Sequence, residues 1–385
     1  DNPFMAGAFH GVTEADKIIN ADEYINTGKP VVFENCVINN DFRGFHFDDM
    51  KGDVLFKNCH INGFNAYGGE GTATFEGCTF GTDTRSRYNG LNIYANTVLT
   101  DCTFIYKSGK TNFIDLEEVG KTLTITNCTA TLDGAAANVA DYVGGSKLPE
   151  CTVTIDGELY IAPVATADAL KKAINAGEQT IYVKGQIDLT EEILANYNGT
   201  IIGADDTACI NTRTFVVKSA DEAFHLSDKT INFKNITIKV PTEDGDFLKT
   251  GFVAAGTMNF DHCVFEGQVT LNGSATWTFD DCEFGGADSG AYASFVYGAK
   301  KATFNRCSFS GVDRAAKVYG TGGVLDVEYN NCTFTSTTSN KFAVNIDASY
   351  ATTKVALNGC SQTGMPGLYL VTGAKATVYV DGVQQ

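Results

Sequence analysis

Several features that mark other classes of protein are scarce in this chain. Proline is rare, at 6 of 385 residues, and charged residues make up only 19%, whereas glycine is plentiful at 40. This composition excludes a disordered chain and indicates a folded, turn-rich one. No apolar stretch approaches the roughly 18 residues that cross a bilayer, so no transmembrane segment is predicted. No secretory leader is visible, but the opening DNPFMAG lacks an initiator methionine and reads as a trimmed, mature chain.

Basic residues are also in short supply. The chain has 28 lysines and arginines against 46 aspartates and glutamates, which gives a net charge of −18. Nucleic acids and anionic membrane faces attract basic surfaces, so neither is an expected partner. The length is enough for one long domain or two ordinary ones with a sizeable core.

Closely spaced cysteine pairs are missing, although the chain has twelve cysteines. Zinc sites in small modules are built from close ligand pairs, and here there is no CxxC. Disulfides remain an alternative, but thiols stacked on parallel strands are poorly aimed for a bond of such specific geometry. The sequence therefore predicts free structural thiols, no metal and no cofactor.

The chain contains instead a recurrent six-residue segment with an aromatic residue first and a cysteine fourth. A period of 19 to 28 residues is typical of a solenoid. Its apolar positions lie three and then two residues apart, so the alternation of a strand slips at a bend. The clearest copies are FENCVI (33–38), FKNCHI (56–61), FEGCTF (75–80), FDHCVF (260–265), FDDCEF (279–284) and FNRCSF (304–309).

The residue at each bend belongs, with one exception, to the types that tolerate a left-handed backbone. The exception is Arg306. Short strands that turn through such corners predict the coils of a parallel β-helix, with each cysteine pointing into the core as a small apolar residue. The corner residues are Asn35, Asn58, Gly77, Asp101, Asn127, Asn235, His262, Asp281, Arg306, Asn331 and Gly359.

The chain also has the pattern of a duplication. Each half opens with a predicted helix that follows an N-cap threonine, at Thr13–Asn26 and at Thr166–Gly177. Such a helix would cover the open end of a coil stack. We therefore predict two tandem β-helical domains, 1–163 and 164–385, each with a short N-terminal capping helix. A single continuous solenoid with an internal helix is the alternative.

This pattern resembles the right-handed parallel β-helix of the pectin-lyase-like superfamily. In particular it resembles uncharacterised secreted or surface β-helix proteins with F-x-N-C-x-F repeats, encoded by gut Bacteroidetes. The resemblance implies an all-β fold, a right-handed parallel β-helix (solenoid), and an extracellular or cell-surface location. Enzymes of the superfamily act through residues on the outer face of one parallel sheet. The sequence lacks the NTD…DD…GHG…RIK series of the polygalacturonase-like hydrolases and the aspartate-and-arginine set of the pectate lyases. No catalytic residue is therefore predicted.

Candidate ligand-binding residues lie on the strands that precede the corners in the first half. These strands read FHFD (45–48), FNAY (64–67), LNIY (91–94) and IDLE (114–117), and the loop TDTRSRYNG (82–90) lies beside them. Strict alternation sends two columns of polar side chains outward, with two tyrosines at the centre and carboxylates at the ends. The predicted site is His46, Asp48, Asn65, Tyr67, Arg85, Arg87, Tyr88, Asn92, Tyr94, Asp115 and Glu117.

Tyrosines flanked by amides and carboxylates suit an oligosaccharide, and the two arginines suit an acidic sugar. We therefore expect a non-catalytic protein that binds glycan or a cell-surface partner. Three alternatives stay open: a polysaccharide lyase or hydrolase, a structural stalk, and a polar sheet face with no ligand. The second half offers a more scattered outward set, which ranks lower: Thr270, Asn272, Lys317, Tyr319, Asn345, Asp347 and Tyr369.

Overall fold

The computed structural model divides the chain into two compact units, Asp1–Ala162 and Pro163–Gln385. They are called the first unit and the second unit. The description covers residues 30–39, 45–81, 88–191, 193–194, 197–212, 224–240, 252–285, 291–298, 300–310, 314–321, 323–336 and 341–385. At 45–49, 64, 224–228 and 252–255 it covers the backbone alone.

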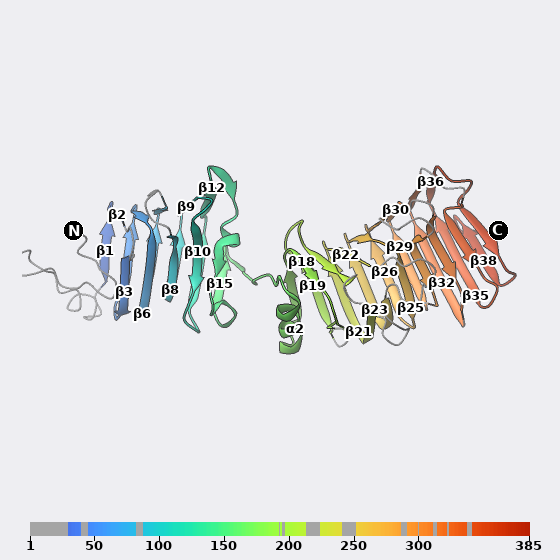
Figure 1. Cartoon of the computed structure of the whole chain (residues 1–385), viewed down its shortest axis with the longest axis horizontal. Coiled ribbons are helices and arrows are strands. Elements are labelled where there is room, and N and C mark those ends of the chain that lie inside the picture. Colours follow the sequence, from blue (N-terminus) through green and yellow to red (C-terminus); the bar gives the residue numbers. More distant parts are fainter. Residues whose placement is uncertain are drawn as a thin grey trace, which may run out of the picture. The chain divides into compact units, whose positions relative to one another are not determined.

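In the first unit, parallel strands stack coil upon coil in three rows (Figure 1). The front and middle rows share one 10-stranded sheet, because β6 and β8 run through both, and the back row is a 6-stranded sheet. The front row comprises β3 (Phe45–Met50), the starts of β6 (Phe64–Glu76) and β8 (Tyr88–Thr100), β10 (Thr111–Leu116) and β14 (Val143–Gly144). The middle row comprises β1 (Val31–Glu34), β4 (Val54–Lys57), the ends of β6 and β8, β11 (Thr122–Thr126) and β15 (Thr152–Ile155), which pairs with β16 (Glu158–Leu159). The back row comprises β2 (Val37–Asn39), β5 (His60–Asn62), β7 (Thr79–Phe80), β9 (Thr103–Tyr106), β12 (Thr129–Leu132) and β13 (Ala135–Ala137).

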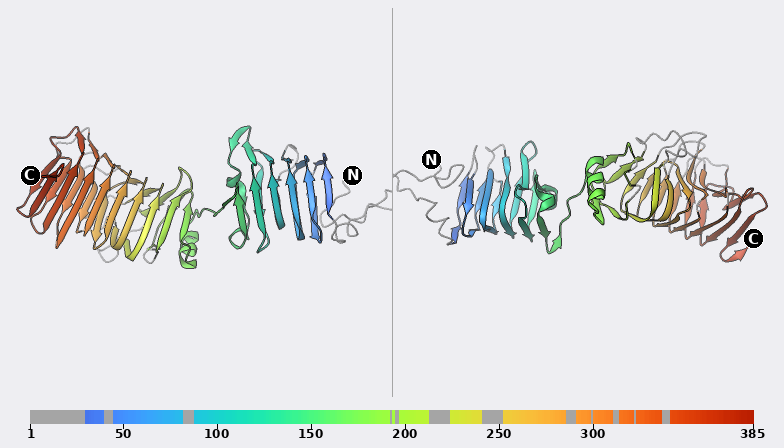
Figure 2. Two further views of the ribbon diagram at one scale, coloured as in Figure 1. Left: turned by 180° about the vertical axis from the view of Figure 1, so that it is seen from behind. Right: turned by 90° about the horizontal axis from the view of Figure 1, so that it is seen from below.

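The second unit has the same three rows, in a 15-stranded and an 8-stranded sheet, and its successive strands lie side by side in every view (Figure 2). The front row comprises the starts of β21 (Phe224–Lys234) and β23 (Phe252–Asp261), β25 (Val269–Gly273), β28 (Tyr292–Tyr297), β31 (Arg314–Tyr319), β34 (Val344–Asp347) and β37 (Tyr369–Thr372). The middle row comprises β17 (Thr180–Val183), β19 (Gly199–Gly203), the ends of β21 and β23, β26 (Thr276–Asp280), β29 (Lys301–Asn305), β32 (Val324–Asn330), β35 (Thr352–Asn358), β38 (Ala376–Val380) and β39 (Val383–Gln384). The back row comprises β18 (Gln186–Asp188), β20 (Cys209–Asn211), β22 (Thr237–Lys239), β24 (Val264–Glu266), β27 (Glu283–Gly285), β30 (Ser308–Ser310), β33 (Thr333–Thr335) and β36 (Ser361–Thr363). The predicted all-β parallel solenoid is confirmed.

One left-handed residue turns the chain from the middle row to the back row at each predicted corner. All eleven predicted positions have φ between 50 and 60°. Arg306 adopts this backbone despite its long side chain, and its guanidinium forms a two-point pair with Asp281, with Nε–Oδ1 at 2.9 Å and Nη2–Oδ2 at 2.7 Å. The last coil of each unit ends differently, in an Asp-Gly hairpin turn at Asp156 and at Asp381, where the chain reverses to pair antiparallel.

Columns of aromatic rings fill the interior of each unit. In the second unit Phe260, Phe279, Phe304 and Tyr329 lie on consecutive coils with ring centroids 4.8 Å apart and planes within 6°. This distance is the spacing of neighbouring strands, so the register of the sheet stacks the rings directly. Each of these side chains is at most 1% exposed.

The cysteines of the repeat form a second interior column, as predicted. Cys59, Cys78, Cys102, Cys263, Cys282, Cys307 and Cys332 are buried, and all twelve cysteines are free. Their thiols also make weak hydrogen bonds. For example, Cys102 Sγ donates to the carbonyl oxygen of Phe75 on the previous coil at 3.4 Å, and Cys332 Sγ donates to that of Phe304 at 3.3 Å. The thiols therefore fill space between the coils and satisfy their own polar group.

A short helix opens the second unit. Helix α2 (Ala167–Ala176) follows Thr166, whose hydroxyl accepts a hydrogen bond from the Ala169 amide at 3.2 Å, and it ends at the left-handed Gly177. Its apolar side, with Leu170 and Ala173, joins the core of the unit. The prediction at 166–177 is confirmed, whereas the helix predicted at Thr13–Asn26 lies outside the described residues. Within the described ranges, no helix has both the length and the apolar character to cross a membrane.

Candidate functional site

The predicted site in the first unit needs a correction, because β6 pairs with β8 one residue out of the expected register. Asn65 lies opposite Leu91, and Tyr67 lies opposite Ile93. Since side chains alternate along a strand, an offset of one residue turns each of them to the other face. Asn65 and Tyr67 therefore point into the core, and the prediction that they face outward is wrong.

The interior accepts both side chains for physical reasons. Tyr67 is 1% exposed, and its ring packs edge-on against Phe56 and Phe75, with centroids at 5.4 and 5.2 Å. Asn65 is fully buried and donates from Nδ2 to the Gly63 carbonyl oxygen at 3.1 Å, so its amide is not left without a partner in the core. Gly63, just before β6, has a positive φ, and the turn at this residue determines which side chains of β6 face the core.

The rest of the predicted site is only partly assembled. Asn92 and Asp115 lie side by side on the outer surface of the front row, and Tyr94 lies beside Gly68 rather than beside a second tyrosine. Tyr94 and Tyr88 are 36% and 39% exposed. The side chains of His46 and Asp48, and the residues Arg85 and Arg87, lie outside the described part of the chain. A ligand-binding role for these residues stays a prediction.

Asp115 and Glu117 form a pair of carboxyl groups on β10 and just after it. Burial, with a smaller contribution from Glu117, raises the pKa of Asp115 to about 6. Glu117 accepts a hydrogen bond from the Ser146 hydroxyl at 2.8 Å. Two carboxyl groups can divide acid and base roles between them, but Glu117 is engaged by the neighbouring coil. The pair does not by itself make a catalytic site.

The front row of the second unit carries a larger aromatic surface. We call it the tyrosine–lysine surface. Phe295 pairs with Lys317 and then Asn345 in one outward column, and Tyr297 pairs with Tyr319 and then Asp347 in the next. The surface comprises Tyr292, Phe295, Tyr297, Arg314, Lys317, Tyr319, Asn345, Asp347 and Tyr350.

Its aromatic rings form one connected group. Tyr297 and Tyr319 are stacked, with centroids 5.5 Å apart and planes 3° apart. Tyr350 leans on Tyr319 at 6.0 Å and is 66% exposed. Phe295 faces outward but is only 5% exposed, because Tyr292 and Tyr297 lie against it at 6.0 and 5.7 Å. The rings therefore hold one another in place and leave Tyr350 open to solvent.

Two cations sit among these rings. Lys317 Nζ lies 5.4 Å from the ring centre of Tyr319 and 5.5 Å from that of Phe295, and Arg314 Cζ lies 5.2 Å from that of Tyr292. Burial lowers the pKa of Lys317 from its ordinary value, while the nearby Asp347 acts in the opposite direction. Lys317 is thus a half-buried ammonium group held mainly by ring faces.

A small cavity of about 140 Å³ opens beside this lysine. Its polar lining can both donate and accept hydrogen bonds. Asn345 uses Nδ2 to bond the Phe342 carbonyl oxygen at 2.9 Å, and Asp347 Oδ1 accepts from the Ser349 hydroxyl at 2.7 Å. The cavity is lined by Tyr292, Lys317, Asn345, Ile346, Asp347, Leu370 and Thr372.

The outward set predicted for the second half is mostly placed as expected. Tyr369 is the exception: it pairs with Val344 in the inward column and packs against the core, so the prediction for it is wrong. Thr270 lies in the outward column but is 2% exposed. The prediction missed five members of the surface. Four of them lie in the segments YASFVY (292–297) and RAAKVY (314–319), and aligning these two segments gives the observed register. The missed residues are Tyr292, Phe295, Tyr297, Arg314 and Tyr350.

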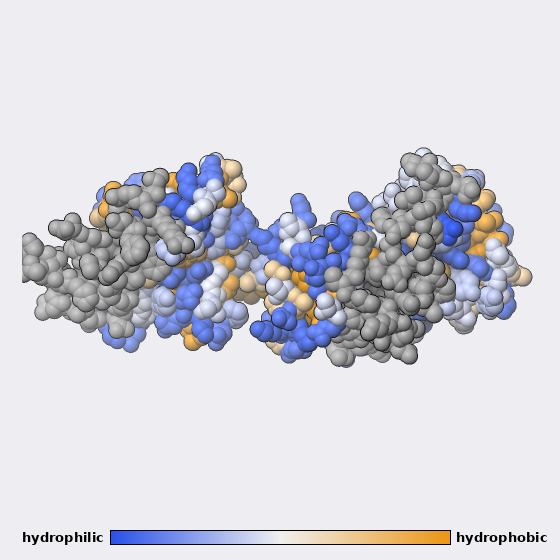
Figure 3. Space-filling model, in the orientation of Figure 1, coloured by the Kyte–Doolittle hydropathy of each residue, from blue (hydrophilic) through white to orange (hydrophobic). Residues whose placement is uncertain are grey.

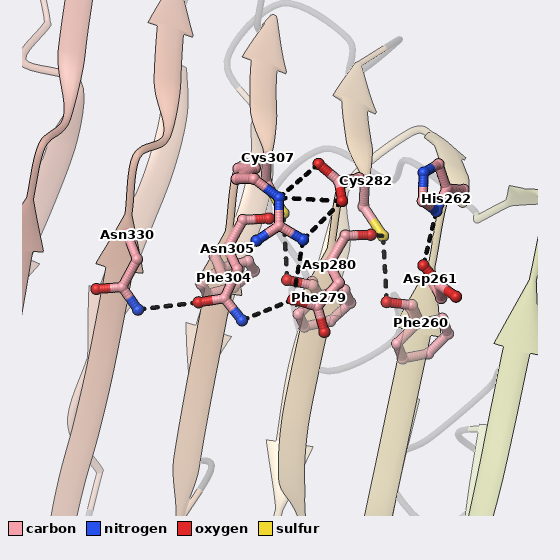
Figure 4. Close-up of polar contacts among 12 residues, drawn as sticks. Phe260, Asp261, His262, Phe279, Asp280, Cys282, Phe304, Asn305, Cys307 and Asn330 are labelled. Atoms are coloured by element: carbon pink, nitrogen blue, oxygen red, sulfur yellow. Dashed lines mark hydrogen bonds and ion pairs between the residues drawn. The ribbon is translucent and has the colours of Figure 1, made fainter.

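A polar ladder follows the corners of the second unit (Figure 4). Asn330 donates from Nδ2 to Asn305 Oδ1 at 2.9 Å, and Asn305 donates in turn to Asp280 Oδ1 at 2.8 Å. His262 Nδ1 lies 2.6 Å from Asp261 Oδ1, and this contact raises the pKa of His262 and lowers that of Asp261. The contacts among Asn330, Asn305 and Asp280 tie each coil to the next. The contact between His262 and Asp261 joins neighbouring residues of one coil, and it too is structural.

A cleft of about 530 Å³ lies beside the ladder, between His262 and the loop that carries Asp205 and Asp206. Asp205 is already engaged, since it accepts hydrogen bonds from Thr207 and pairs with Lys184 at 3.6 Å. Within the described ranges, no group of three or more histidines, cysteines or carboxylates is arranged to hold a metal ion. Among the residues coloured in Figure 3, hydrophilic ones predominate and hydrophobic ones form smaller patches. The tyrosine–lysine surface is therefore the strongest candidate site.

Comparison with known proteins adds little to this geometry. No protein-family model and no curated protein sequence matches the chain. Among solved structures the chain is similar to "Structure of sacteLam55A from Streptomyces sp. SirexAA-E", with 10% sequence identity and a TM-score of 0.23 over 94% of this chain and 92% of that chain. A likeness this remote carries no argument, so the fold and the candidate site rest on the chain's own strands and side chains.

Proposed function

We propose that this protein is a non-catalytic carbohydrate-binding β-helix that works outside the cell or at its surface, and that it binds sugar on the tyrosine–lysine surface. The observation that carries the proposal is the exposed ring of Tyr350, held against the stacked pair Tyr297 and Tyr319. Sugar rings present apolar faces that pack on aromatic rings, and a preorganised ring loses little conformational entropy on binding.

Polar groups that can hydrogen-bond sugar hydroxyl groups lie beside those rings. Tyr319 and Asp347 are direct neighbours on β31 and β34, and Lys317 and Asn345 are neighbours in the adjacent column. Carboxylate, amide and ammonium groups together can accept from and donate to a sugar hydroxyl. The same arrangement places the polar cavity next to the rings, so that one sugar could contact both.

The test is binding of the whole chain to a glycan array, with the dissociation constant of each hit measured by calorimetry. Replacing both rings, by Tyr319→Ala plus Tyr350→Ala, is expected to weaken binding at least about tenfold, because each aromatic contact contributes roughly 0.5–1.5 kcal/mol beyond buried area. The control is Tyr94→Ala, which removes a partly exposed tyrosine from the front row of the first unit.

Three results would contradict the proposal. Full binding by a correctly folded double variant would remove the tyrosine–lysine surface from consideration. Loss of binding in Tyr94→Ala alone would move the site to the first unit. Release of new reducing ends or of unsaturated sugars from any bound polysaccharide would show that the protein is an enzyme.

A further inference from the structure

The cations of the tyrosine–lysine surface, Lys317 and Arg314, form no ion pair with any carboxylate that the structure describes. Among the described residues, no carboxylate oxygen lies within 4.0 Å of Lys317 or Arg314. Elsewhere in the second unit such pairs are common, for example Lys301 with Glu328 at 3.5 Å and Lys354 with Asp326 at 3.7 Å. The chain as a whole has a net charge of −18, yet Lys317 and Arg314 lie against one ring with no described carboxylate at ion-pair distance.

From these contacts we propose that the tyrosine–lysine surface selects sugars that carry an anionic group, a sulfate ester or a carboxylate, and that Lys317 binds this group with Arg314 beside it. This inference rests on the proposed function, because it concerns the same surface. Arg314 and Lys317 come from one strand, β31, three residues apart, and both lie against the ring of Tyr292, at 5.2 and 5.7 Å. The ring thus brings the two positive charges together.

The rings position Lys317 without neutralising it. A ring face attracts a cation through its quadrupole but carries no net charge, so the ammonium group keeps its charge for a ligand. Its contacts with the rings of Phe295 and Tyr319 also limit its rotamers before binding. A preorganised cation loses less entropy when an anion arrives than a free surface lysine does.

The cavity beside Lys317 has a suitable size. Its volume of about 140 Å³ corresponds to four or five water molecules at roughly 30 Å³ each. That space accommodates a sulfate or carboxylate group with part of a sugar ring. Asp347 also lines this cavity and would repel an anion, so the anionic group is expected next to Lys317 and a sugar hydroxyl next to Asp347.

Partial burial of the Lys317 ammonium group also favours the binding of an anion. Burial lowers the pKa of Lys317, which means that its charged form is incompletely solvated. An anion in the cavity would supply the missing stabilisation and raise that pKa again. Anion binding should therefore weaken as the pH rises through the pKa of Lys317, which burial places below its ordinary value.

The experiment compares matched sugars on the full chain. The probes are hexasaccharides of β-1,4-glucose, β-1,3-glucose and β-1,4-galactose, each in neutral, sulfated and C6-oxidised form, measured by calorimetry at low and moderate salt. At least one anionic form should bind about tenfold or more tightly than its neutral parent, and more weakly at higher salt. Comparing sulfated with oxidised forms identifies which anion is preferred.

Variants test whether Lys317 causes the preference for anionic sugars. Lys317→Gln should abolish the preference for the anionic form, and Lys317→Arg should retain most of it. The matched control is Lys354→Gln, since Lys354 also lies over a ring, that of Tyr379 at 5.8 Å, but has Asp326 as its partner. Thermal unfolding of each variant verifies its fold.

The outcomes separate the two proposals. Equal affinity for neutral and anionic forms overturns this inference and leaves carbohydrate binding standing. A preference that survives in Lys317→Gln overturns the role of the lysine. Binding to none of the nine probes overturns both proposals.

Discussion

At the scale of single residues, the left-handed corner determines much of this molecule. A backbone with φ near 50° is costly for most L-residues, so asparagine, aspartate, glycine and histidine occupy the corners almost throughout. These same side chains are polar and exposed, and stacking brings them within reach of one another. His262 illustrates the result, because its contact with Asp261 follows from the position of the corner rather than from any requirement of a catalytic site.

The histidine contact predicts a pH effect. The pKa of His262 should lie above 6.5, because Asp261 stabilises the protonated ring and Asp281 adds attraction. A raised folded-state pKa means that the contribution to stability is fully present below 6.5 and is lost as the pH rises through the folded value. An NMR titration of the ring should show this raised midpoint. Asp261→Asn should bring it down, although Lys234, which pairs with Asp261 at 3.4 Å, is freed in that variant. A wild-type midpoint at or below 6.5 would refute the contact.

At the scale of elements, the sequence predicts the corners and the interior thiols better than the outer surface. A corner has a chemical signature of its own, and all the predicted positions, including Arg306, are left-handed. The strands of the front row contain no residue type that identifies which side chains face outward. FNAY and LNIY look alike, yet Tyr67 is interior and Tyr94 is exterior, because the turn before each strand sets its phase. Turn geometry depends on packing with neighbouring coils, which a local pattern does not contain. For the same reason the sequence predicts only some of the residues of the tyrosine–lysine surface.

The corrected register makes a direct prediction for these two tyrosines. Tyr67→Ala should lower the free energy of unfolding of the first unit by at least about 3 kcal/mol, because it leaves a cavity against Phe56 and Phe75. Tyr94→Ala removes a partly exposed ring and should change it by no more than about 0.5 kcal/mol. Urea titrations of the two variants against the wild type test this contrast, and the opposite ranking would restore the register expected from the sequence.

At the scale of the whole molecule, each unit has a core of its own. The buried side chains of the first unit and those of the second form two separate clusters. The single tryptophan of the chain, Trp277, is fully buried in the second cluster. Its fluorescence therefore reports on the second unit alone, which gives a simple probe for following that unit in the complete protein.

The separate cores predict that residues 163–385, produced alone, fold to the same structure. The fragment should unfold cooperatively in urea, and its tryptophan emission should match that of the full chain, because Trp277 keeps its apolar surroundings. Phe304→Ala in the fragment serves as a destabilised reference, since that ring lies in the interior column. Red-shifted emission from the unmodified fragment, like that of the urea-unfolded chain, would show that the second unit needs the rest of the protein.

The columns of rings and thiols determine how such a chain can change in length. Because each coil offers its neighbours nearly the same side chains, a coil can be duplicated or deleted without leaving a hole or an unmatched edge. A solenoid unit can therefore grow or shrink only in whole steps of about 4.8 Å. Related chains with more or fewer copies of the repeat would therefore differ in the length of each sheet by whole coils.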